Sequence, residues 1–297
     1  MRIGLRLGGP EIELLALTEQ GRELLRRRAP APDGYEATLD AVAGLVAAAE
    51  KELGSQACVG VATPGSASAQ SGKMERSSLA WLDGRALKAD LQQKLAREVR
   101  TANDANCFAL SEAVDGAARR AACVFGVLLG TGVGGAIVAR GHLRQDLDAS
   151  TREWGHTPMP FVRGDVDGSA HACYCGHQGC IETYLSAAAL AREHVSRGGE
   201  ALEPDAIAAR AAAGDAACAA SLERYEDLLA RAFGQVINIV APDVIVLGGR
   251  IADLDRLYTN VPQRWMRYAF SGRVTTRLVK NLHGVASRTR GAAWLWD

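Results

Sequence analysis

The sequence has no excess of either charge, with 34 Lys and Arg against 34 Asp and Glu. A balanced chain offers no general attraction to nucleic acid or to an anionic membrane surface. It also has no apolar run of about 18 residues, and its first ten residues alternate polar and apolar side chains instead of forming a signal-peptide core. These absences favour a cytoplasmic protein whose partner is a small molecule.

Cysteines are few, seven in 297 residues, and their number is odd. A sparse, odd set argues against a disulfide framework and is typical of a reducing compartment. Hydrophobic residues make up 48% of the chain and charged residues 23%, as in an ordinary folded protein. A chain of this length usually folds as two domains or as one large α/β unit, and we expect two lobes.

Two segments read as strand, glycine turn and returning strand. In the first, residues 2–7 alternate polar and apolar side chains, Gly8-Gly9-Pro10 turns the chain, and residues 11–17 return. In the second, residues 124–129 lead into Gly130-Thr131-Gly132 and residues 136–139 return. This internal duplication predicts two similar α/β lobes with a cleft between them. Glycine turns facing that cleft could hold phosphates through backbone N–H groups.

The rest of the chain alternates strands and helices. We expect helices at 35–53, at 91–99, from 103 through 118, over most of 183–240 and at 291–296, and strands at 22–28, 58–62 and 244–247. The predicted lobes are residues 1–118 and 119–287, with the C-terminal helix, about 288–297, packing back on the first lobe.

The densest local pattern is Cys173-Tyr-Cys175-Gly-His-Gln-Gly-Cys180, which follows His156 in Glu153-Trp-Gly-His156. Three thiols and one imidazole suit a closed tetrahedral zinc site. His171 and His177 are alternative imidazole ligands, although each lies close in sequence to a cysteine ligand. The alternative without metal is three unrelated loop cysteines, but lone cysteines normally sit singly in apolar cores, as Cys107 and Cys218 could.

The run from Glu153 to Glu182 resembles the zinc and sugar signature of the ROK family of bacterial repressors and sugar kinases. Asn103-Asp104-Ala-Asn, Leu-Gly130-Thr-Gly, Asp243-Val-Ile-Val-Leu-Gly-Gly and Arg290-Gly-Ala-Ala-Trp extend the resemblance over nearly the whole chain. The Trp-Leu-Trp ending makes it most similar to fructokinase and mannokinase-type members. Family repressors add an N-terminal helix-turn-helix, and a first strand beginning at residue 2 favours the kinase branch.

The resemblance implies a two-lobed actin-like ATPase fold, related to ribonuclease H, and an ATP-dependent hexose kinase acting on fructose or a mannose- or glucose-like sugar. It implies structural Zn²⁺, Mg²⁺ with ATP, and a homodimer. Asp104 is implied as the general base that deprotonates the sugar hydroxyl. His156 would bind both zinc and sugar through its two ring nitrogens. The implied sugar contacts are Asn103, Glu153, His156 and Glu182; the implied nucleotide contacts are Gly8, Gly9, Gly130, Thr131, Gly132, Gly248 and Gly249; the implied zinc ligands are His156, Cys173, Cys175 and Cys180.

Each of these residues has a plainer explanation. Asp104 could be the N-cap of the helix that follows it, since Asp favours that position. Glu153 and Glu182 could be solvated surface carboxylates, and the glycines could serve hairpin turns. No Gly-Lys-Ser or Gly-Lys-Thr ends either turn, so neither is a Walker A loop.

Four segments depart from the family pattern. Arg6 stands where the family has a carboxylate that helps hold Mg²⁺, and Pro10 removes a hydroxyl and a backbone N–H. Side chains from Asp146 to Arg152 replace a glycine-rich loop, Arg76-Ser77-Ser78 replaces an asparagine-rich sugar loop, and Arg250 replaces a third glycine. Besides a working kinase, these losses leave open a pseudokinase that binds sugar or nucleotide without efficient turnover, and a regulator.

Overall fold

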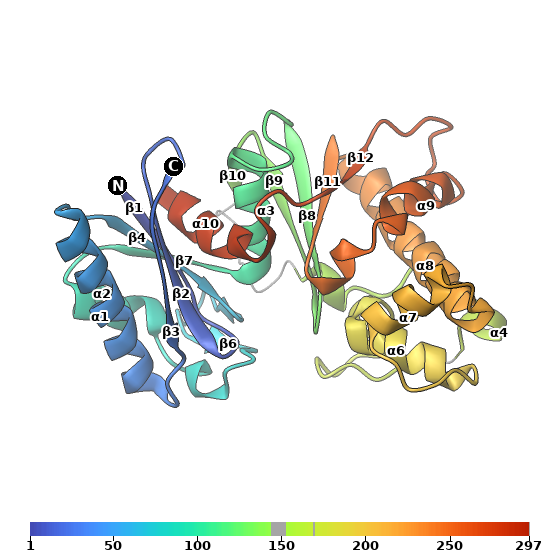
Figure 1. The fold of residues 1–297 in the computed structure, drawn as a ribbon, viewed down its shortest axis with the longest axis horizontal. Helices are drawn as coiled ribbons and strands as arrows, with labels where there is room; N and C mark the ends of the chain where they lie inside the picture. Colours follow the sequence, from blue (N-terminus) through green and yellow to red (C-terminus); the bar gives the residue numbers. More distant parts are fainter. Residues whose placement is uncertain (144–152, 169, 297) are drawn as a thin grey trace. The chain divides into compact units, whose positions relative to one another are not determined.

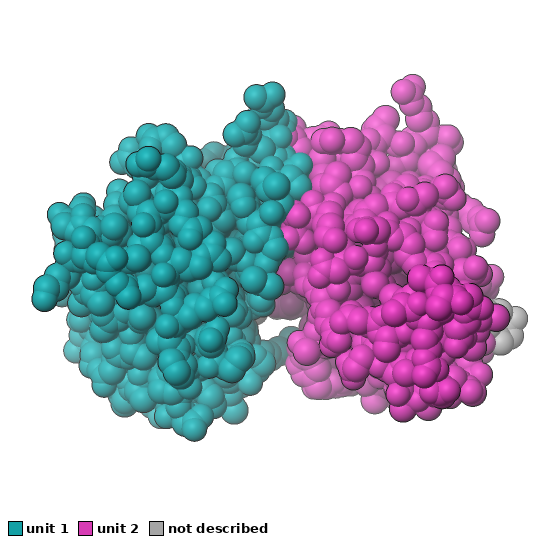
Figure 2. Space-filling model, in the orientation of Figure 1, with its two compact units in different colours: residues 1–120, 137–152, 282–297 teal, residues 121–136, 153–281 magenta. Residues whose placement is uncertain are grey.

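The computed structural model describes residues 1–143, 153–168 and 170–296. The chain divides into two compact units (Figure 2). Unit 1 comprises residues 1–120, 137–152 and 282–297, and unit 2 comprises residues 121–136 and 153–281. The division into lobes 1–118 and 119–287 stays a prediction. No helix among the described residues is long and apolar enough to cross a membrane.

Unit 1 is built on a five-stranded sheet with the order β3-β2-β1-β4-β7 (Figure 1). β1 runs antiparallel to β2, and β2 antiparallel to β3, whereas β1, β4 and β7 are parallel. A small hairpin, β5 with β6, follows β4. The strands are β1 (Arg2–Arg6), β2 (Glu11–Leu17), β3 (Glu23–Pro30), β4 (Cys58–Thr63), β5 (Ser66–Ala67), β6 (Met74–Glu75) and β7 (Val99–Asn103).

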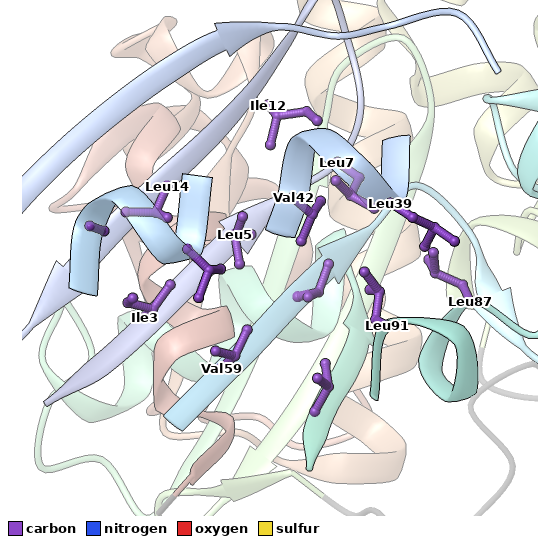
Figure 3. Close-up of a cluster of buried hydrophobic side chains, with 14 of the residues drawn as sticks. Ile3, Leu5, Leu7, Ile12, Leu14, Leu39, Val42, Val59, Leu87 and Leu91 are labelled. Atoms are coloured by element: carbon purple, nitrogen blue, oxygen red, sulfur yellow. The ribbon is translucent and has the colours of Figure 1, made fainter. Parts of the chain in front are cut away.

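One face of this sheet carries the hydrophobic core of unit 1. Because side chains alternate along a strand, Ile3, Leu5 and Leu7 all point to the same face, where they are fully buried. Helices α1 (Tyr35–Leu53) and α2 (Leu87–Leu95) cover that face, and α1 contributes Val42 and Val46 at helical spacing (Figure 3). Burial of each such side chain stabilises the fold by ~1.5–3 kcal/mol.

The opposite face receives α3 (Asp104–Val114) and α10 (Ser287–Ala293), which pack against each other; α10 lies mainly on β1 and β4, and α3 on β4 and β7. Glycines allow a close approach of backbones there. A Cβ on Gly4 would lie 2.0 Å from the Thr289 carbonyl oxygen, and one on Gly60 would lie 1.8 Å from that of Ala292. The C-terminal helix is thereby pressed onto the strands that lead to Asp104.

Unit 2 contains most of a second five-stranded sheet, whose order is β10-β9-β8-β11-β12. As in the first sheet, the strand that opens the repeat, β8, has the next two strands of the chain, β9 and β10, on one side. On its other side lie β11 and β12, which run parallel to it. The repeated order confirms the duplication expected from the two glycine hairpins. The strands are β8 (Cys123–Leu129), β9 (Val133–Ala139), β10 (His142–Leu143), β11 (Val244–Gly248) and β12 (Arg277–Lys280).

Trp154 links the second sheet to the helical part of unit 2. Its ring meets Phe125 of β8 edge-on at 5.3 Å and stacks on Phe233 of α8 at 5.8 Å. The region 183–240, predicted to be mostly helical, is confirmed as helical by α5 to α8. The α-helices of unit 2 are α4 (Gly164–Asp167), α5 (Glu182–Leu185), α6 (Ala187–Ser196), α7 (Pro204–Ala212), α8 (Ala216–Val240) and α9 (Arg256–Trp265). Short 3₁₀ turns are η1 (Ala80–Leu82), η3 (Trp154–His156), η4 (Arg250–Asp253), η5 (Gly284–Ala286) and η6 (Trp294–Trp296).

Three helix predictions have wrong boundaries. The helix expected at 291–296 begins earlier, as α10 at Ser287, and ends in the 3₁₀ turn η6. The helix expected at 91–99 is α2, which ends at Leu95 because Ala96 adopts a left-handed conformation, and Val99 already begins β7. The helix expected to run through 118 ends at Val114, where the Glu112 carboxylate accepts a hydrogen bond from the Ala117 N–H. The end of α2 carries neither the glycine nor the proline that marks a helix end in sequence, whereas Gly116 follows the Asp115 cap of α3 and was a usable signal.

Candidate active site

The parallel strands β1, β4 and β7 of unit 1 have their C-terminal ends at the same edge of the sheet. There Arg6 of β1 pairs with Ala62 of β4, and Thr63 of β4 pairs with Asn103 of β7. Ligands of α/β sheets bind at this carboxyl edge of parallel strands, where the chain leaves the sheet. The first glycine turn and the Asn103-Asp104 motif therefore share one edge of unit 1. The Arg76-Ser77-Ser78 loop lies there as well, because the Ser78 N–H donates to the Pro64 carbonyl.

Asn103 is the N-cap of α3, and Asp104 is its first residue. The Asn103 side-chain oxygen accepts a hydrogen bond from the Asn106 N–H at 2.8 Å, and its amide nitrogen lies 3.2 Å from the Ser66 hydroxyl. The capping role considered for Asp104 therefore belongs to its neighbour. The Asp104 carboxylate is not needed to satisfy the helix terminus.

Two cations face the buried carboxylate of Asp104. Its Oδ2 lies 3.0 Å from Nη1 of Arg288, whereas its Oδ1 is buried without a hydrogen-bond partner. Burial raises the pKa of this carboxyl, and the charges of Arg288 and Arg6 oppose that rise. Asp104 thus has one oxygen in an ion pair and the other without a hydrogen-bond partner, and this second oxygen can accept a proton, as a general base must.

Arg6 places a positive charge at the end of β1. Its Nη1 donates to the Gly8 carbonyl at 2.8 Å, while its Nε is buried without a partner. Burial and the nearby Arg288 lower the pKa of Arg6, and Asp104 and Glu13 oppose that shift. Gly8 and Gly9 both have positive φ, +130° and +77°, a region that favours glycine.

In unit 2, Glu182 holds the second glycine turn. The Val133 N–H donates to the Glu182 carboxylate at 2.8 Å, and a Cβ on Gly132 would lie 2.8 Å from the same oxygen. The Gly130 carbonyl accepts a hydrogen bond from Ala187, just beyond α5. Glu182, predicted as a sugar contact, therefore touches the predicted phosphate turn directly. Thr131 is exposed at the tip of that turn.

The third glycine pair lies beside the second turn. Gly248 ends β11, and a Cβ on Gly249 would approach the Leu129 carbonyl oxygen, at the end of β8, to 2.3 Å. Arg250 points to acidic residues at the start of α7: its guanidinium lies 2.7 Å from Asp205 and 3.2 Å from Glu203. The extra arginine is thus held by its own ion pairs.

The structure brings the four predicted zinc ligands together. The ligand atoms of His156, Cys173, Cys175 and Cys180 all lie within 4.8 Å of one another. Zinc–sulfur distances of about 2.3 Å place tetrahedral sulfurs roughly 3.8 Å apart, and the Cys175 and Cys180 sulfurs are 3.6 Å apart. Nδ1 of His156 is 3.4 Å from the Cys173 sulfur, so this nitrogen faces the thiols.

The alternative histidines lie outside this group. His177 contacts only the Cys175 sulfur among the thiols in the hydrogen bonds described, at 3.5 Å, and His171 lies against the Tyr184 ring. Hydrogen bonds from the His177 backbone and side chain lower the pKa of Cys175 to about 6, whereas burial raises that of Cys180 to about 12. A thiolate, the form that binds zinc, is therefore favoured at Cys175.

Glu153 and His156 flank a 3₁₀ turn pressed onto the second sheet. A Cβ on Gly155 would lie 1.9 Å from the Val133 carbonyl oxygen, so only glycine allows η3 to approach β9 this closely. Glu153, half-buried, begins this turn, and its carbonyl accepts the His156 N–H. Nε2 of His156 lies 3.0 Å from the Tyr174 hydroxyl.

Sequence reasoning missed Tyr174 and Arg288. Tyr174 lies between two predicted zinc ligands in sequence, and Arg288 lies 184 residues from Asp104. Neither belongs to a motif, so no local signal could have found them. The predicted substitutions from Asp146 to Arg152 lie outside the described residues.

Comparison with known proteins gives one consistent result. A sequence profile described as the ROK family matches residues 2–297. N-acetyl-D-glucosamine kinase from Escherichia coli O127:H6 is 37% identical over 300 residues, which cover 99% of each chain. The ROK hexokinase from Thermus thermophilus matches with a TM-score of 0.87 at 25% identity, over 99% of this chain and 96% of that one. A ROK family glucokinase from Streptomyces griseus, solved with glucose and AMPPNP, matches with a TM-score of 0.78 at 25% identity, over 99% and 98%.

Proposed function

Because the chain belongs to the ROK family, we propose that it is an ATP-dependent sugar kinase and that its sugar is N-acetyl-D-glucosamine. The observation that carries the proposal is the 37% identity to an N-acetyl-D-glucosamine kinase across 99% of both chains. The Oδ1 atom of Asp104 also supports the proposal, because it is buried without a hydrogen-bond partner and can accept a proton. The fold is the actin-like ATPase fold of ROK kinases, as expected from the sequence.

The fructokinase and mannokinase-type assignment expected from the sequence is not confirmed, because the curated relatives named in the comparison are N-acetyl-D-glucosamine kinases. These relatives also give no support to a pseudokinase or a regulator. In the Trp-Leu-Trp ending, Trp294 and Leu295 are buried in unit 1, where they contribute to packing and carry no information about the sugar.

Asp104 is the proposed general base. It would accept the proton of the attacking sugar hydroxyl on Oδ1, while the hydroxyl oxygen forms a bond to the γ-phosphorus and ADP leaves. Asn103 would fix this geometry by capping α3 and by contacting the sugar. Arg288 and Arg6 act on the Asp104 carboxyl through their positive charges, and Arg288 contacts it directly.

The residues of unit 2 have complementary proposed roles. Glu153, His156 and Glu182 would bind sugar hydroxyls, and the turns at Gly130–Gly132 and Gly248–Gly249 would bind the nucleotide through backbone N–H groups. Because Glu182 already accepts the Val133 N–H, its second oxygen is the one that a sugar hydroxyl would reach. Sugar binding and the phosphate turn are coupled through this one carboxylate.

Zinc is the proposed resident metal, held by His156, Cys173, Cys175 and Cys180. The donor set and the sulfur spacing fit a closed structural site. With Nδ1 at the metal, Nε2 of His156 carries the proton and can donate outward. The metal would supply no chemistry of its own; it would hold the loop that carries His156 and Tyr174.

Magnesium would enter as part of the substrate, MgATP. The two carboxylates that act on Arg6 are both already paired: Asp104 with Arg288, and Glu13 with Arg28 and the Thr289 hydroxyl. Among the described residues, the two carboxylates that act on Arg6 are therefore both engaged with other side chains at the end of β1.

Restoring the family pattern at this turn is expected to accelerate the reaction. In the double variant Arg6→Asp, Pro10→Thr, the new carboxylate can orient Mg²⁺-bound water, and the threonine returns a hydroxyl and an N–H toward the phosphates. If these interactions contribute ~1.4–3 kcal/mol in the transition state, kcat/KM for ATP should rise roughly 10- to 150-fold, with little change in KM for sugar. Steady-state kinetics at varied Mg²⁺ measures this.

Arg6→Met is the matched control, because it removes the cation without adding a ligand. A restored variant slower than the parent, together with a slow Arg6→Met, would contradict the prediction and assign phosphate neutralisation to Arg6. Restoration without any gain in rate counts against it as well.

The function itself is tested by coupled ADP release over a panel of sugars, including N-acetyl-D-glucosamine, glucose, mannose and fructose, with and without Mg²⁺. The highest kcat/KM is expected for N-acetyl-D-glucosamine. Turnover of fructose alone would contradict the substrate, and no ADP release with any sugar would contradict the activity. The homodimer stays a prediction, which analytical ultracentrifugation of the same preparation can check.

A further inference from the structure

The ion pair between Arg288 and Asp104 connects the C-terminal helix to the proposed catalytic base. Arg288 comes from α10, and its Nη1 lies 3.0 Å from Oδ2 of Asp104. The two side chains retain 27% and 21% of their exposure, so the pair is largely shielded from solvent. A charge pair in such surroundings is screened much less than one on the surface.

The surroundings of Asp104 otherwise disfavour its ionised form. Burial raises the pKa of the carboxyl, and the thiol of Cys107, on the same helix, supplies no positive charge. Two cations act against burial: Arg288 from α10 and Arg6 from β1. Glu13 of β2, which is paired with Arg28 of β3, acts on Arg6, where its negative charge raises the pKa of the guanidinium. Arg288 is the cation that touches the carboxylate.

The pair is not needed to anchor α10, because the other polar side chains around Arg288 have their own partners. The Ser287 hydroxyl donates to Glu112, the Thr289 hydroxyl to Glu13, and Arg290 pairs with Asp115. Gly291 packs so closely on the Cys107 carbonyl that a Cβ would lie 1.7 Å from its oxygen. Arg288 thus differs from its neighbours in holding a residue of the proposed active site.

We propose that Arg288 is a positioning residue for sugar phosphorylation: it binds Oδ2 of Asp104, keeps the carboxylate ionised, and turns Oδ1 toward the sugar hydroxyl. This inference rests on the proposed function, since it assigns a partner to the proposed base. The buried, unpaired Oδ1 is the second observation behind it, because a buried acceptor without a donor is costly unless a ligand supplies one.

The test is the pH dependence of kcat/KM for sugar in Arg288→Gln and Arg288→Lys, from about pH 5 to about pH 8. Loss of the positive charge raises the pKa of Asp104, and a base works only while it is ionised. The acidic limb of the pH–activity profile should therefore move to higher pH in the variant. For Arg288→Gln we expect the ratio of kcat/KM at pH 8 to that at pH 5 to rise about tenfold over the parent. Arg288→Lys, which keeps the charge, should stay near the parent ratio.

Thr289→Val is the matched control on the same helical turn. It removes the buried hydrogen bond to Glu13 and tests whether any disturbance of α10 moves the profile. It should lower stability without changing the ratio. The same shift in Thr289→Val and Arg288→Gln would overturn the proposal, and so would an Arg288→Gln profile identical to the parent.

A second measurement does not depend on activity. Carbon-13 NMR of protein labelled at aspartate carboxyls follows the ionisation of Asp104 directly, and Asp104→Asn assigns its signal. The signal should titrate at higher pH in Arg288→Gln than in the parent, and equal titration would overturn the proposal. A parent inactive on every sugar contradicts the proposed function, while the carboxyl titration still decides whether Arg288 sets the ionisation of Asp104.

Discussion

Asp104→Asn is expected to lower kcat by about 10²–10⁴-fold, since this is the typical contribution of a positioned general base. The fold should survive because Asn103, not Asp104, caps α3. The amide cannot take a proton from the sugar hydroxyl, although it can still lie against Arg288. KM for sugar should change far less than kcat, because the lost interaction acts mainly in the transition state.

Asp33→Asn is a matched control, because it makes the same chemical change at an exposed residue outside the site. It should leave kcat unchanged. Steady-state kinetics together with circular dichroism separates loss of catalysis from loss of fold. If Asp104→Asn phosphorylates the sugar at the parent rate, Asp104 is not the base and the mechanism proposed above is wrong.

Removal of the proposed zinc is expected to loosen residues 156–180 and to lower the melting temperature. Structural zinc sites supply apparent binding free energies of ~10–16 kcal/mol, which stabilise segments that have little core of their own. The cluster also holds His156, so sugar affinity should fall together with stability. Metal analysis, thermal denaturation with and without chelator, and sugar titration measure the three effects.

Cys180→Ser should reproduce the effect of the chelator, because Cys180 lies in the cluster and is almost fully buried. Cys58→Ser is its control, since Cys58 is an exposed free thiol outside the cluster. It should retain one zinc per chain and the parent melting temperature. Less than one zinc per chain in the parent, combined with a melting temperature indifferent to chelator, would contradict the zinc site.

Patterns of neighbouring residues predicted those helices and strands whose limits depend on the local sequence alone. The helix expected at 35–53 has these bounds in the structure, because its apolar residues recur at helical spacing and Gly54 ends it in a left-handed conformation. The glycines of the two hairpins correctly predicted the start of each of the two similar sheets. The end of α2 at Ala96 was not predictable, since alanine favours helix and only the requirement to begin β7 at Val99 forces the turn.

The sequence by itself determined the His156, Cys173, Cys175 and Cys180 cluster, the glycine turns and the position of Asp104, because short motifs fix their own spacing and the residues between them. The tertiary structure alone decided which groups surround Asp104. Arg288 reaches it from the other end of the chain because Gly4, Gly60 and Gly291 let α10 pack closely on β1, β4 and α3. Electrostatics depends on distances in space, and packing of distant segments, not spacing along the chain, sets those distances.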